Sequence, residues 1–256
     1  DWLREAGVPV DVLGVRGKWD VLKLRTLTSL LKAWNVEFLH THLFHAALAG
    51  GWAAARTSVP HWVHTIHTAE QRFRPWQFAL EHWMAARCEM RIAVSESVRE
   101  HHARLAHLRP ERYTVIPNGV DASAYRRDAG KRAKLRGQWG VAEGEVLAAC
   151  VGRLHYEKGT DLLLEAYRVG GEALPKLVLA GEGPMRGRVE KFIAGEPAGK
   201  RLRLLSRVDD VAGVLSAADL LVMPSRWEGF GLAAAEAMAA QVPVVGFAVS
   251  GLREVV

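Results

Sequence analysis

Two carboxylates near the end of the chain stand in a pattern that suits ligand binding. Glu228 and Glu236 belong to the run MPSRWEGFGLAAAEAM at 223–238, with seven residues between them. The apolar run 220–223 predicts a buried strand, Pro224 ends it, and alanines of high helix propensity follow two glycines. Both carboxylates would face the carboxyl end of the strand, where open α/β sheets bind ligands and a helix N-terminus offers N–H groups to anions. The alternative is one solvated loop Glu and one exposed helix Glu.

A second candidate site is the run GRLHYEKG at 152–159, which follows a predicted strand and precedes a predicted helix. Gly152 allows close backbone approach, and Arg153 and Lys158 place two cations at one strand end. A diphosphate needs such charges, because Arg binds it as a fork and Lys as a point charge. The alternative is a loop with two solvated cations.

Two shorter segments carry weaker signals. The run AGEGP at 180–184 is a glycine turn between strand and helix, which is common in α/β proteins. The residues Asp209 and Asp210 precede a predicted helix, and we interpret them as capping residues rather than ligands.

Ten of the eleven histidines lie before residue 110. A spacing of two in a strand puts side chains on one face, so a metal site is conceivable in geometry. No Cys or carboxylate completes either set, and we therefore interpret them as structural or surface residues and predict no metal. The two sets are His40, His42, His45 and His61, His64, His67.

Alternating elements must position these residues. In the first part of the chain, helices are expected around 24–34, 77–90 and 97–105, and strands at 8–13, 36–40, 61–66, 91–94 and 113–116. In the second part, helices are expected at 161–169, 185–194 and 211–217, and strands at 146–151, 177–180, 202–205, 220–223 and 243–247. This alternation predicts an α/β protein with parallel sheets wound on both faces.

The charged stretch 121–145 is the predicted connection between an N-terminal domain at 1–120 and a C-terminal domain at 146–256. Ser95 and Asn118 fall at strand ends of the first domain. These two positions suit either a cleft or ordinary turns.

Composition is that of a globular protein, with 49% apolar and 24% charged residues. We expect Cys88 and Cys150 to be reduced core thiols in a cytoplasmic protein. The longest apolar run, Ala46–Ala55, is too short to span a bilayer. Residues 1–140 hold 21 Lys/Arg against 13 Asp/Glu, an excess of +8 that favours an anionic partner. Nucleic acid lacks a visible recognition motif, whereas a membrane surface or an anionic lipid acceptor fits.

Taken together, these segments resemble the retaining GT-B glycosyltransferases of group 1, also called family 4. The run 223–238 is similar to the E-x7-E segment of that family, 152–159 to its G-R-L-x-x-x-K-G motif, and 180–184 to its G-x-G-P turn. The resemblance extends from about Pro9 to Val256. It implies two Rossmann-like doubly wound domains facing a cleft. The first domain and the C-terminal end are expected to be incomplete, because the family's first glycine-rich loop and its last helix lack counterparts.

The resemblance also implies an activity. A sugar would pass from a nucleotide diphosphate donor to an acceptor hydroxyl with retention, in cell-surface glycan or glycolipid synthesis. The expected partners are the nucleotide-diphosphate sugar as co-substrate, a sugar or lipid-linked acceptor, and an anionic membrane surface at the inner face; no nucleic acid and no cofactor are expected.

Roles for particular residues follow from the resemblance. His67 would contact the donor sugar, Glu228 would orient sugar hydroxyls, and Glu236 would bind the ribose. The implied catalytic residues are His67, Arg153, Lys158 and Glu228. The implied donor-binding residues are Gly152, Arg153, Lys158, Gly181, Gly183, Val208, Gly229, Phe230, Gly231, Leu232 and Glu236. The implied acceptor or cleft residues are His42, Ser95 and Asn118.

Two alternatives from other classes remain open. A sugar-nucleotide epimerase of the same fold would need acid/base carboxylates in the first domain, where we identify none. A non-catalytic basic protein that binds nucleic acid or membrane would explain the charge, but not the paired glutamates and the cationic motif.

Overall fold

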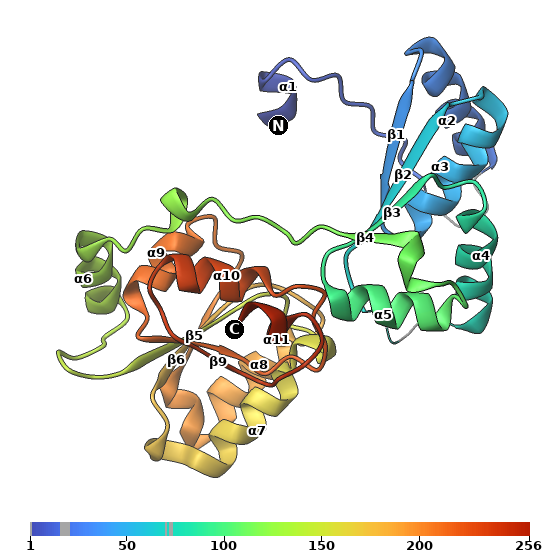
Figure 1. Cartoon of the computed structure of the whole chain (residues 1–256). Helices are drawn as coiled ribbons and strands as arrows, with labels where there is room; N and C mark the ends of the chain where they lie inside the picture. Colours follow the sequence, from blue (N-terminus) through green and yellow to red (C-terminus); the bar gives the residue numbers. More distant parts are fainter. Residues whose placement is uncertain (1, 16–20, 70, 72–73) are drawn as a thin grey trace. The chain divides into compact units, whose positions relative to one another are not determined.

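The computed structural model describes residues 2–15, 21–69, 71 and 74–256. The chain divides into two compact units (Figure 1). The first unit comprises residues 1–93 and 99–116, and the second comprises 94–98 and 117–256. Residues 121–145, the predicted connection, lie in the second unit by this division.

The first unit contains a parallel sheet in the strand order β1-β2-β3-β4. A helix connects each strand to the next, as parallel neighbours require. The strands are β1 (Phe38–His42), β2 (His61–Ile66), β3 (Met90–Ala93) and β4 (Tyr113–Val115). The helices up to residue 116 are α1 (Trp2–Glu5), α2 (Val21–Ala33), α3 (Phe44–Thr57), α4 (Pro75–Ala85), α5 (Glu96–Leu105) and the short 3₁₀ helix η1 (Pro110–Arg112).

Trp62 of β2 belongs to an apolar core of the first unit. It packs with Phe44 and Ala47 of α3 and with Met84 of α4. A Cβ on Gly51 of α3 would lie 2.4 Å from the Trp62 ring, so only glycine fits there. The alanine-rich run 46–55 lies within α3 and packs in this core. Because the run is uniformly apolar, it has no helical periodicity, and the sequence did not indicate this helix.

The structure differs from two predictions in this unit. Residues 8–13 form no strand, and the side chains of Val8 and Val12 are exposed. An alternating pattern makes a segment suitable for a strand, but the segment also needs a neighbouring strand with which to pair. Helix α4 ends at Ala85 rather than near residue 90. The amide of Cys88 there bonds back to the Met84 carbonyl, and this turn leads the chain into β3.

The second unit contains a parallel sheet in the order β7-β6-β5-β8-β9. The strands are β5 (Leu147–Val151), β6 (Lys176–Ala180), β7 (Leu202–Leu205), β8 (Leu220–Met223) and β9 (Val244–Gly246). The α-helices are α6 (Ala129–Gln138), α7 (Thr160–Gly170), α8 (Arg186–Gly195), α9 (Val211–Ala217), α10 (Leu232–Ala239) and α11 (Leu252–Val255). The 3₁₀ helices are η2 (Ala122–Tyr125), η3 (Tyr156–Lys158), η4 (Gly171–Ala173) and η5 (Pro197–Arg201).

Two apolar cores lie on opposite faces of this second sheet. Alternate strand residues such as Leu147 and Leu221 pack with α9 and α10, whereas Ala148 and Leu177 pack with α7 and α8. Figure 1 shows the two helix layers on either side of the strands. A doubly wound α/β arrangement with parallel sheets is thus confirmed.

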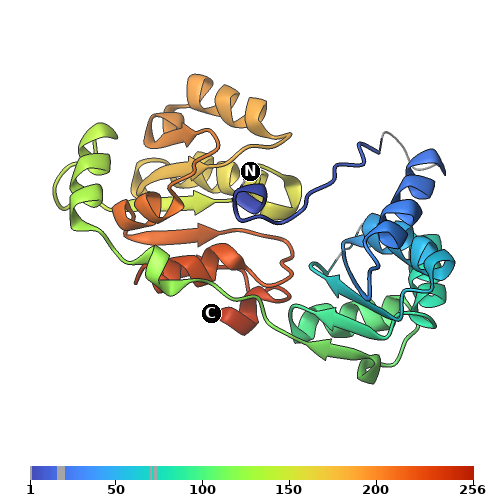
Figure 2. The same cartoon turned by 90° about the horizontal axis from the view of Figure 1, so that it is seen from above.

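Helix α6 packs against α9 at one end of the second unit (Figure 2). Arg132 and Arg136 reach Asp219 at 2.5 and 2.9 Å and also bond carbonyl groups at the end of α9. Two of the cations counted in residues 1–140 therefore belong to the second unit and are paired with one of its carboxylates. Residues 1–116 alone hold 15 Lys/Arg against 11 Asp/Glu, an excess of +4. No helix within the described ranges is long and apolar enough to cross a membrane.

Candidate functional site

The two motifs that could do chemistry meet where the strand order of the second sheet reverses. Strands β5 and β8 are neighbours, although β6 and β7 lie between them in the chain. The run 152–159 follows β5, and the run 224–231 follows β8. This is the topological switch point, outside which open α/β sheets bind ligands.

Lys158 and Glu228 form an ion pair at this point. The Lys158 Nζ atom lies 2.7 Å from Oε1 and 2.8 Å from Oε2 of Glu228. The Ser225 hydroxyl donates to Oε1 of the same carboxylate at 2.7 Å. The Glu228 side chain is 6% exposed, so this loop Glu is not the solvated one of the alternative interpretation. A buried carboxylate needs such partners to offset the loss of water.

The backbones of the two motifs also touch. Gly159 has φ +66°, and a Cβ there would lie 1.8 Å from the Pro224 carbonyl oxygen. The amide of Arg226 donates to the Glu157 carbonyl at 2.8 Å. Glycine at 159 is therefore required by both its dihedral angle and the close approach.

Arg153 is held by a carboxylate that the sequence-based prediction missed. Its guanidinium forms an ion pair with Glu157, whose side chain is 8% exposed, against 64% for Arg153. His155 Nδ1 lies 3.7 Å from the other oxygen of Glu157. The sequence held no local signal for this pair, because a spacing of four brings side chains together on a helix, whereas Arg153 lies in the loop before η3.

The glycine turn at 180–184 packs closely against the backbone of the first motif. A Cβ on Gly181 would lie 1.9 Å from the Gly152 carbonyl oxygen, and one on Gly183 would lie 2.4 Å from that of Leu154. The amide of Leu154 donates to the Glu182 carbonyl at 2.9 Å. Both glycines thus shape the loop that carries Arg153.

The loop after β8 leads into α10 through Gly231, which has φ +98° as the residue before the helix. Gly229 and Phe230 precede it, and Leu232 begins the helix. Glu236 lies half-buried on α10, where burial raises the pKa of its carboxyl and the Tyr125 hydroxyl of η2 donates a hydrogen bond to it. Tyr125 was not among the predicted site residues.

The remaining predicted positions of the second unit differ in their surroundings. Ser95 is buried, and its hydroxyl donates to the Gly229 carbonyl at 2.6 Å. Asn118 is partly exposed in the irregular segment after β4, and Val208 packs at the edge of the α9 core. Asp210 caps α9 by accepting from the Gly213 amide at 2.9 Å, as expected. The side chain of Asp209 is 98% exposed and makes no such cap.

In the first unit, His42 and His67 come together at the carboxyl ends of β1 and β2. Their rings share a hydrogen bond, Nδ1 to Nε2, of 2.8 Å. Burial, and then the neighbouring His42 and His40, lower the pKa of His67. His40 is anchored on Thr65 Oγ1 at 2.7 Å.

The second histidine set does not converge. His61 pairs with Glu89 at 2.7 Å, whereas His64 is buried, where burial lowers its pKa to about 4. Among the described residues, no three His, Cys, Asp or Glu side chains are grouped as ligands for a metal ion.

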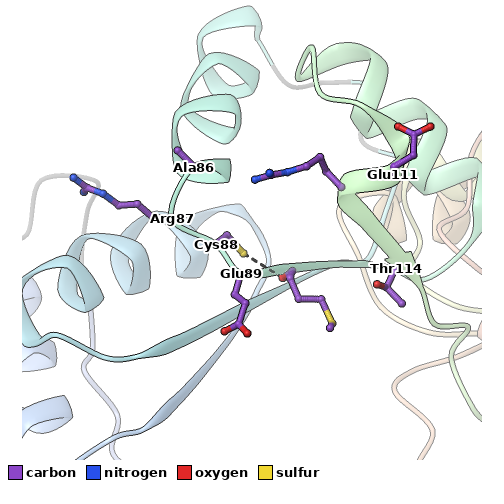
Figure 3. Close-up of a pocket in the computed structure, with 8 residues that line it drawn as sticks. Ala86, Arg87, Cys88, Glu89, Glu111 and Thr114 are labelled. Atoms are coloured by element: carbon purple, nitrogen blue, oxygen red, sulfur yellow. Dashed lines mark hydrogen bonds between the residues drawn. The ribbon is translucent and has the colours of Figure 1, made fainter.

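A polar cavity of about 430 Å³ lies elsewhere in the first unit (Figure 3). Its lining comes from the segments that precede β3 and β4, so it lies at the amino ends of these strands. None of the predicted site residues lines it. Burial raises the pKa of the Cys88 thiol within it, which lowers the fraction of the reactive thiolate form. The lining residues are Ala86, Arg87, Cys88, Glu89, Met90, Glu111, Arg112 and Thr114.

Two family profiles match the chain almost end to end. The profile of "Glycosyl transferases group 1" matches residues 131–256, and that of "Glycosyltransferase Family 4" matches residues 1–124.

Named relatives match along most of the chain. An Escherichia coli UDP-Gal:alpha-D-GlcNAc-diphosphoundecaprenol alpha-1,3-galactosyltransferase is 29% identical over 243 residues, which are 91% of this chain and 63% of that protein. A D-inositol 3-phosphate glycosyltransferase of Xylanimonas cellulosilytica is 32% identical, over 86% of this chain and 57% of that protein. The chain thus spans between about half and two thirds of the length of these curated relatives.

The fold is shared with solved structures. Anabaena HepE in complex with UDP-glucose superposes with a TM-score of 0.88 at 22% identity, over 100% of this chain and 71% of that one. Sucrose-phosphate synthase from Thermosynechococcus elongatus gives a TM-score of 0.78 at 24% identity, over 94% of this chain and 64% of that one.

Proposed function

We propose that this chain, which belongs to the group 1 glycosyltransferases of the GT-B fold, transfers a sugar from a nucleotide diphosphate donor to an acceptor hydroxyl with retention. The observation that carries the proposal is the contact of Lys158 with Glu228. This contact brings together two groups at the switch point of the second sheet: Lys158, which we propose binds phosphate, and Glu228, which we propose binds sugar hydroxyls.

Lys158 and Arg153 would bind the diphosphate. Both cations are already paired with carboxylates, Glu228 and Glu157. An ammonium group has three donors, so Lys158 can bond a phosphate oxygen while it keeps a bond to Glu228. Cations held in place before the reaction stabilise the charge that develops on the leaving diphosphate without further reorganisation.

Glu228 would orient the donor sugar. Its carboxylate is shielded from water, and its charge is balanced by Lys158. Hydroxyl groups of a sugar can donate to lone pairs that Lys158 and Ser225 leave open. Glu236 on α10 would accept from the ribose, and the amides of Gly229, Phe230 and Gly231 would assist at the start of the helix.

His67 is proposed as a donor-sugar contact from the first unit, with His42 beside it. The proposal is supported by the hydrogen bond between the two rings at the strand ends. Because His67 shares that bond, its ring is oriented rather than free to rotate.

For the acceptor, we propose a sugar or lipid-linked group at the cytoplasmic face of an anionic membrane, in glycan or glycolipid synthesis. One relative is named for a diphosphoundecaprenol substrate. The exposed Trp76 and Trp83 lie seven residues apart on one face of α4, and the Arg87 guanidinium lies 5.2 Å above the Trp83 ring. Trp together with Arg suits a membrane–water interface.

Calorimetry with UDP and turnover of radiolabelled nucleotide sugars test the proposed function. We expect UDP to bind with and without EDTA, Lys158→Ala to weaken binding, and labelled sugar to be transferred or hydrolysed from the donor. Binding that EDTA abolishes and magnesium restores would contradict the assigned cations. An epimerised donor would support the epimerase alternative, and neither binding nor turnover would support a non-catalytic protein.

A further inference from the structure

Arg226 makes an unusually complete set of contacts beside the candidate site. Its Nη1 and Nη2 atoms donate to Oδ1 and Oδ2 of Asp161 at 2.8 and 2.7 Å. Nη1 also donates to the Tyr156 carbonyl at 2.7 Å, and the guanidinium carbon lies 3.7 Å from the centre of the Tyr156 ring. The two charged side chains are 21% and 18% exposed. The guanidinium group thus bonds a carboxylate and a carbonyl group, and one of its faces lies against an aromatic ring.

These contacts connect the two motifs on both sides of Lys158. Arg226 lies in the loop after β8, two residues before Glu228. Tyr156 begins η3, which ends at Lys158, and Asp161 lies in the first turn of α7. One side chain from the second motif therefore holds the residues that flank Lys158 in the first.

The pair of Lys158 and Glu228 cannot by itself keep the two motifs in place during the proposed reaction. Each member takes on a bond to the donor, so of the two bonds between Lys158 and Glu228 one is kept and one is given up as the donor binds. Arg226 and Asp161 have no assigned contact with the donor, and their bidentate pair would persist. The pair of Arg226 and Asp161 would stay closed beside the pair of Lys158 and Glu228. It would thereby keep the reacting groups at the distance that the reaction needs.

We propose that Arg226 is a positioning residue that, through Asp161 and Tyr156, fixes Lys158 relative to Glu228 in the donor-bound protein. This inference rests on the proposed function of those two residues. Arginine suits this role, because its planar fork donates two parallel bonds to Asp161 and a third to the Tyr156 carbonyl while its face lies on the Tyr156 ring. Lysine keeps the charge, but its single nitrogen lacks this fixed planar geometry.

The variants for the test are Arg226→Ala, Arg226→Lys, Asp161→Asn and the double variant Arg226→Ala/Asp161→Asn. Arg168→Ala is the matched control. Arg168 also pairs with a carboxylate, Glu196 at 3.1 Å, and lies over a ring, Phe192 at 5.5 Å, but it belongs to neither motif. Thermal unfolding, the Kd for UDP, kcat and KM, and hydrogen exchange of peptides 156–161 and 225–228 are measured on each.

We expect Arg226→Ala and Arg226→Lys to lower kcat by about 100-fold, which is the size of effect that a small misplacement of reacting groups produces. Their thermal midpoints should fall somewhat below that of Arg168→Ala, because Arg226 and Asp161 are less exposed than Arg168 and Glu196. Exchange in both peptides should rise in the Arg226 and Asp161 variants and not in Arg168→Ala. The double variant should be no worse than Arg226→Ala, because both changes remove the same contact.

Three results would overturn the inference. If Arg226→Ala left kcat, UDP affinity and exchange as in Arg168→Ala while the unaltered protein bound UDP, Arg226 would not position the site. If Arg226→Lys restored full turnover, the charge alone would suffice. If the unaltered protein bound no UDP and neither transferred nor hydrolysed any labelled nucleotide sugar, the proposed function would fail first, and the inference with it.

Discussion

Lys158 and Glu228 lie 70 positions apart in the chain, yet the lysine Nζ is within 2.8 Å of both carboxylate oxygens. The glutamate is 6% exposed and the lysine 29%. The carboxylate therefore depends on this lysine and on Ser225 for nearly all the stabilisation that water would otherwise supply. The same two groups are the ones to which we assign the leaving phosphate and the donor sugar.

The asymmetric burial of this pair predicts unequal effects on stability. Lys158→Met leaves a buried carboxylate without its cation, and we expect a loss of about 2 kcal/mol, below the usual range for fully buried pairs because the lysine is partly exposed. Glu228→Gln should cost about 1 kcal/mol or less, since the lysine can turn to water. Urea unfolding of the two variants measures the difference. The double variant, which buries no charge, should be more stable than Lys158→Met; a less stable one would refute the argument.

The two glutamates should have separable kinetic roles. Glu236 is assigned to the ribose, which changes little in the reaction, so Glu236→Gln should raise KM for the donor and leave kcat nearly intact. Glu228 is assigned to the reacting sugar, so Glu228→Gln should lower kcat by about 100-fold or more. Steady-state kinetics on both variants tests this. The opposite pattern would exchange the roles, and unchanged kinetics in both would remove the assignment.

Gly159→Ala should be far more damaging than its conformation alone explains. Gly140 has the same φ of +66°, and no atom lies within 4 Å of the place that an alanine methyl group would take, which makes Gly140→Ala the matched control. The control should cost about 1–2 kcal/mol for the left-handed backbone. Gly159→Ala adds the overlap with the Pro224 carbonyl and should cost about 4 kcal/mol or more. Equal losses in thermal or urea unfolding would show that the two motif backbones do not press on each other.

The first unit should lose stability in acid. Burial lowers the pKa of His64 to about 4 and that of His102 to about 3, both from 6.5. The unfolded chain therefore binds more protons below pH 6.5, so this contribution is complete above that pH and is lost as the pH falls toward 4. Each histidine gives a slope of at most about 1.4 kcal/mol per pH unit.

His64→Gln isolates one of these contributions. Burial raises the pKa of Glu81, which acts in the opposite direction, but that group is present in both proteins. We expect a shallower decline in stability between pH 6.5 and 4 for the variant. Hydrogen exchange of amides in β2 and β3 under native conditions provides the measurement, and identical slopes would contradict the assignment of the buried neutral imidazole.

Binding to membranes should be weak and sensitive to salt. The attraction comes from the net positive charge of residues 1–116, and it acts over a Debye length of about 10 Å at 0.1 M salt. Flotation should recover the protein with anionic vesicles at low salt and much less with neutral ones. Trp83→Ser should weaken this recovery. Equal recovery with both vesicle types would rule out an electrostatic membrane contact.

Much of the fold was predictable because its signals are local. The strand at 61–66 and the helix at 211–217 agree with β2 and α9 to the residue, and Asp210 caps the helix. The failures also have local causes. Residues 8–13 alternate without a partner strand, and the run 46–55 is apolar on all sides, so it carries no periodicity that would mark a helix.

The sequence by itself determined which residues carry charge and that the chain alternates between strand and helix. Only the tertiary structure decided that β5 and β8 are neighbours, and with that the contacts of Lys158 with Glu228 and of Arg226 with Asp161. The reason is physical. Propensity and periodicity act over a few residues, whereas strand order is set by how two helix layers bury the faces of a whole sheet. A contact between residues 70 positions apart depends on that order, and no local pattern contains it.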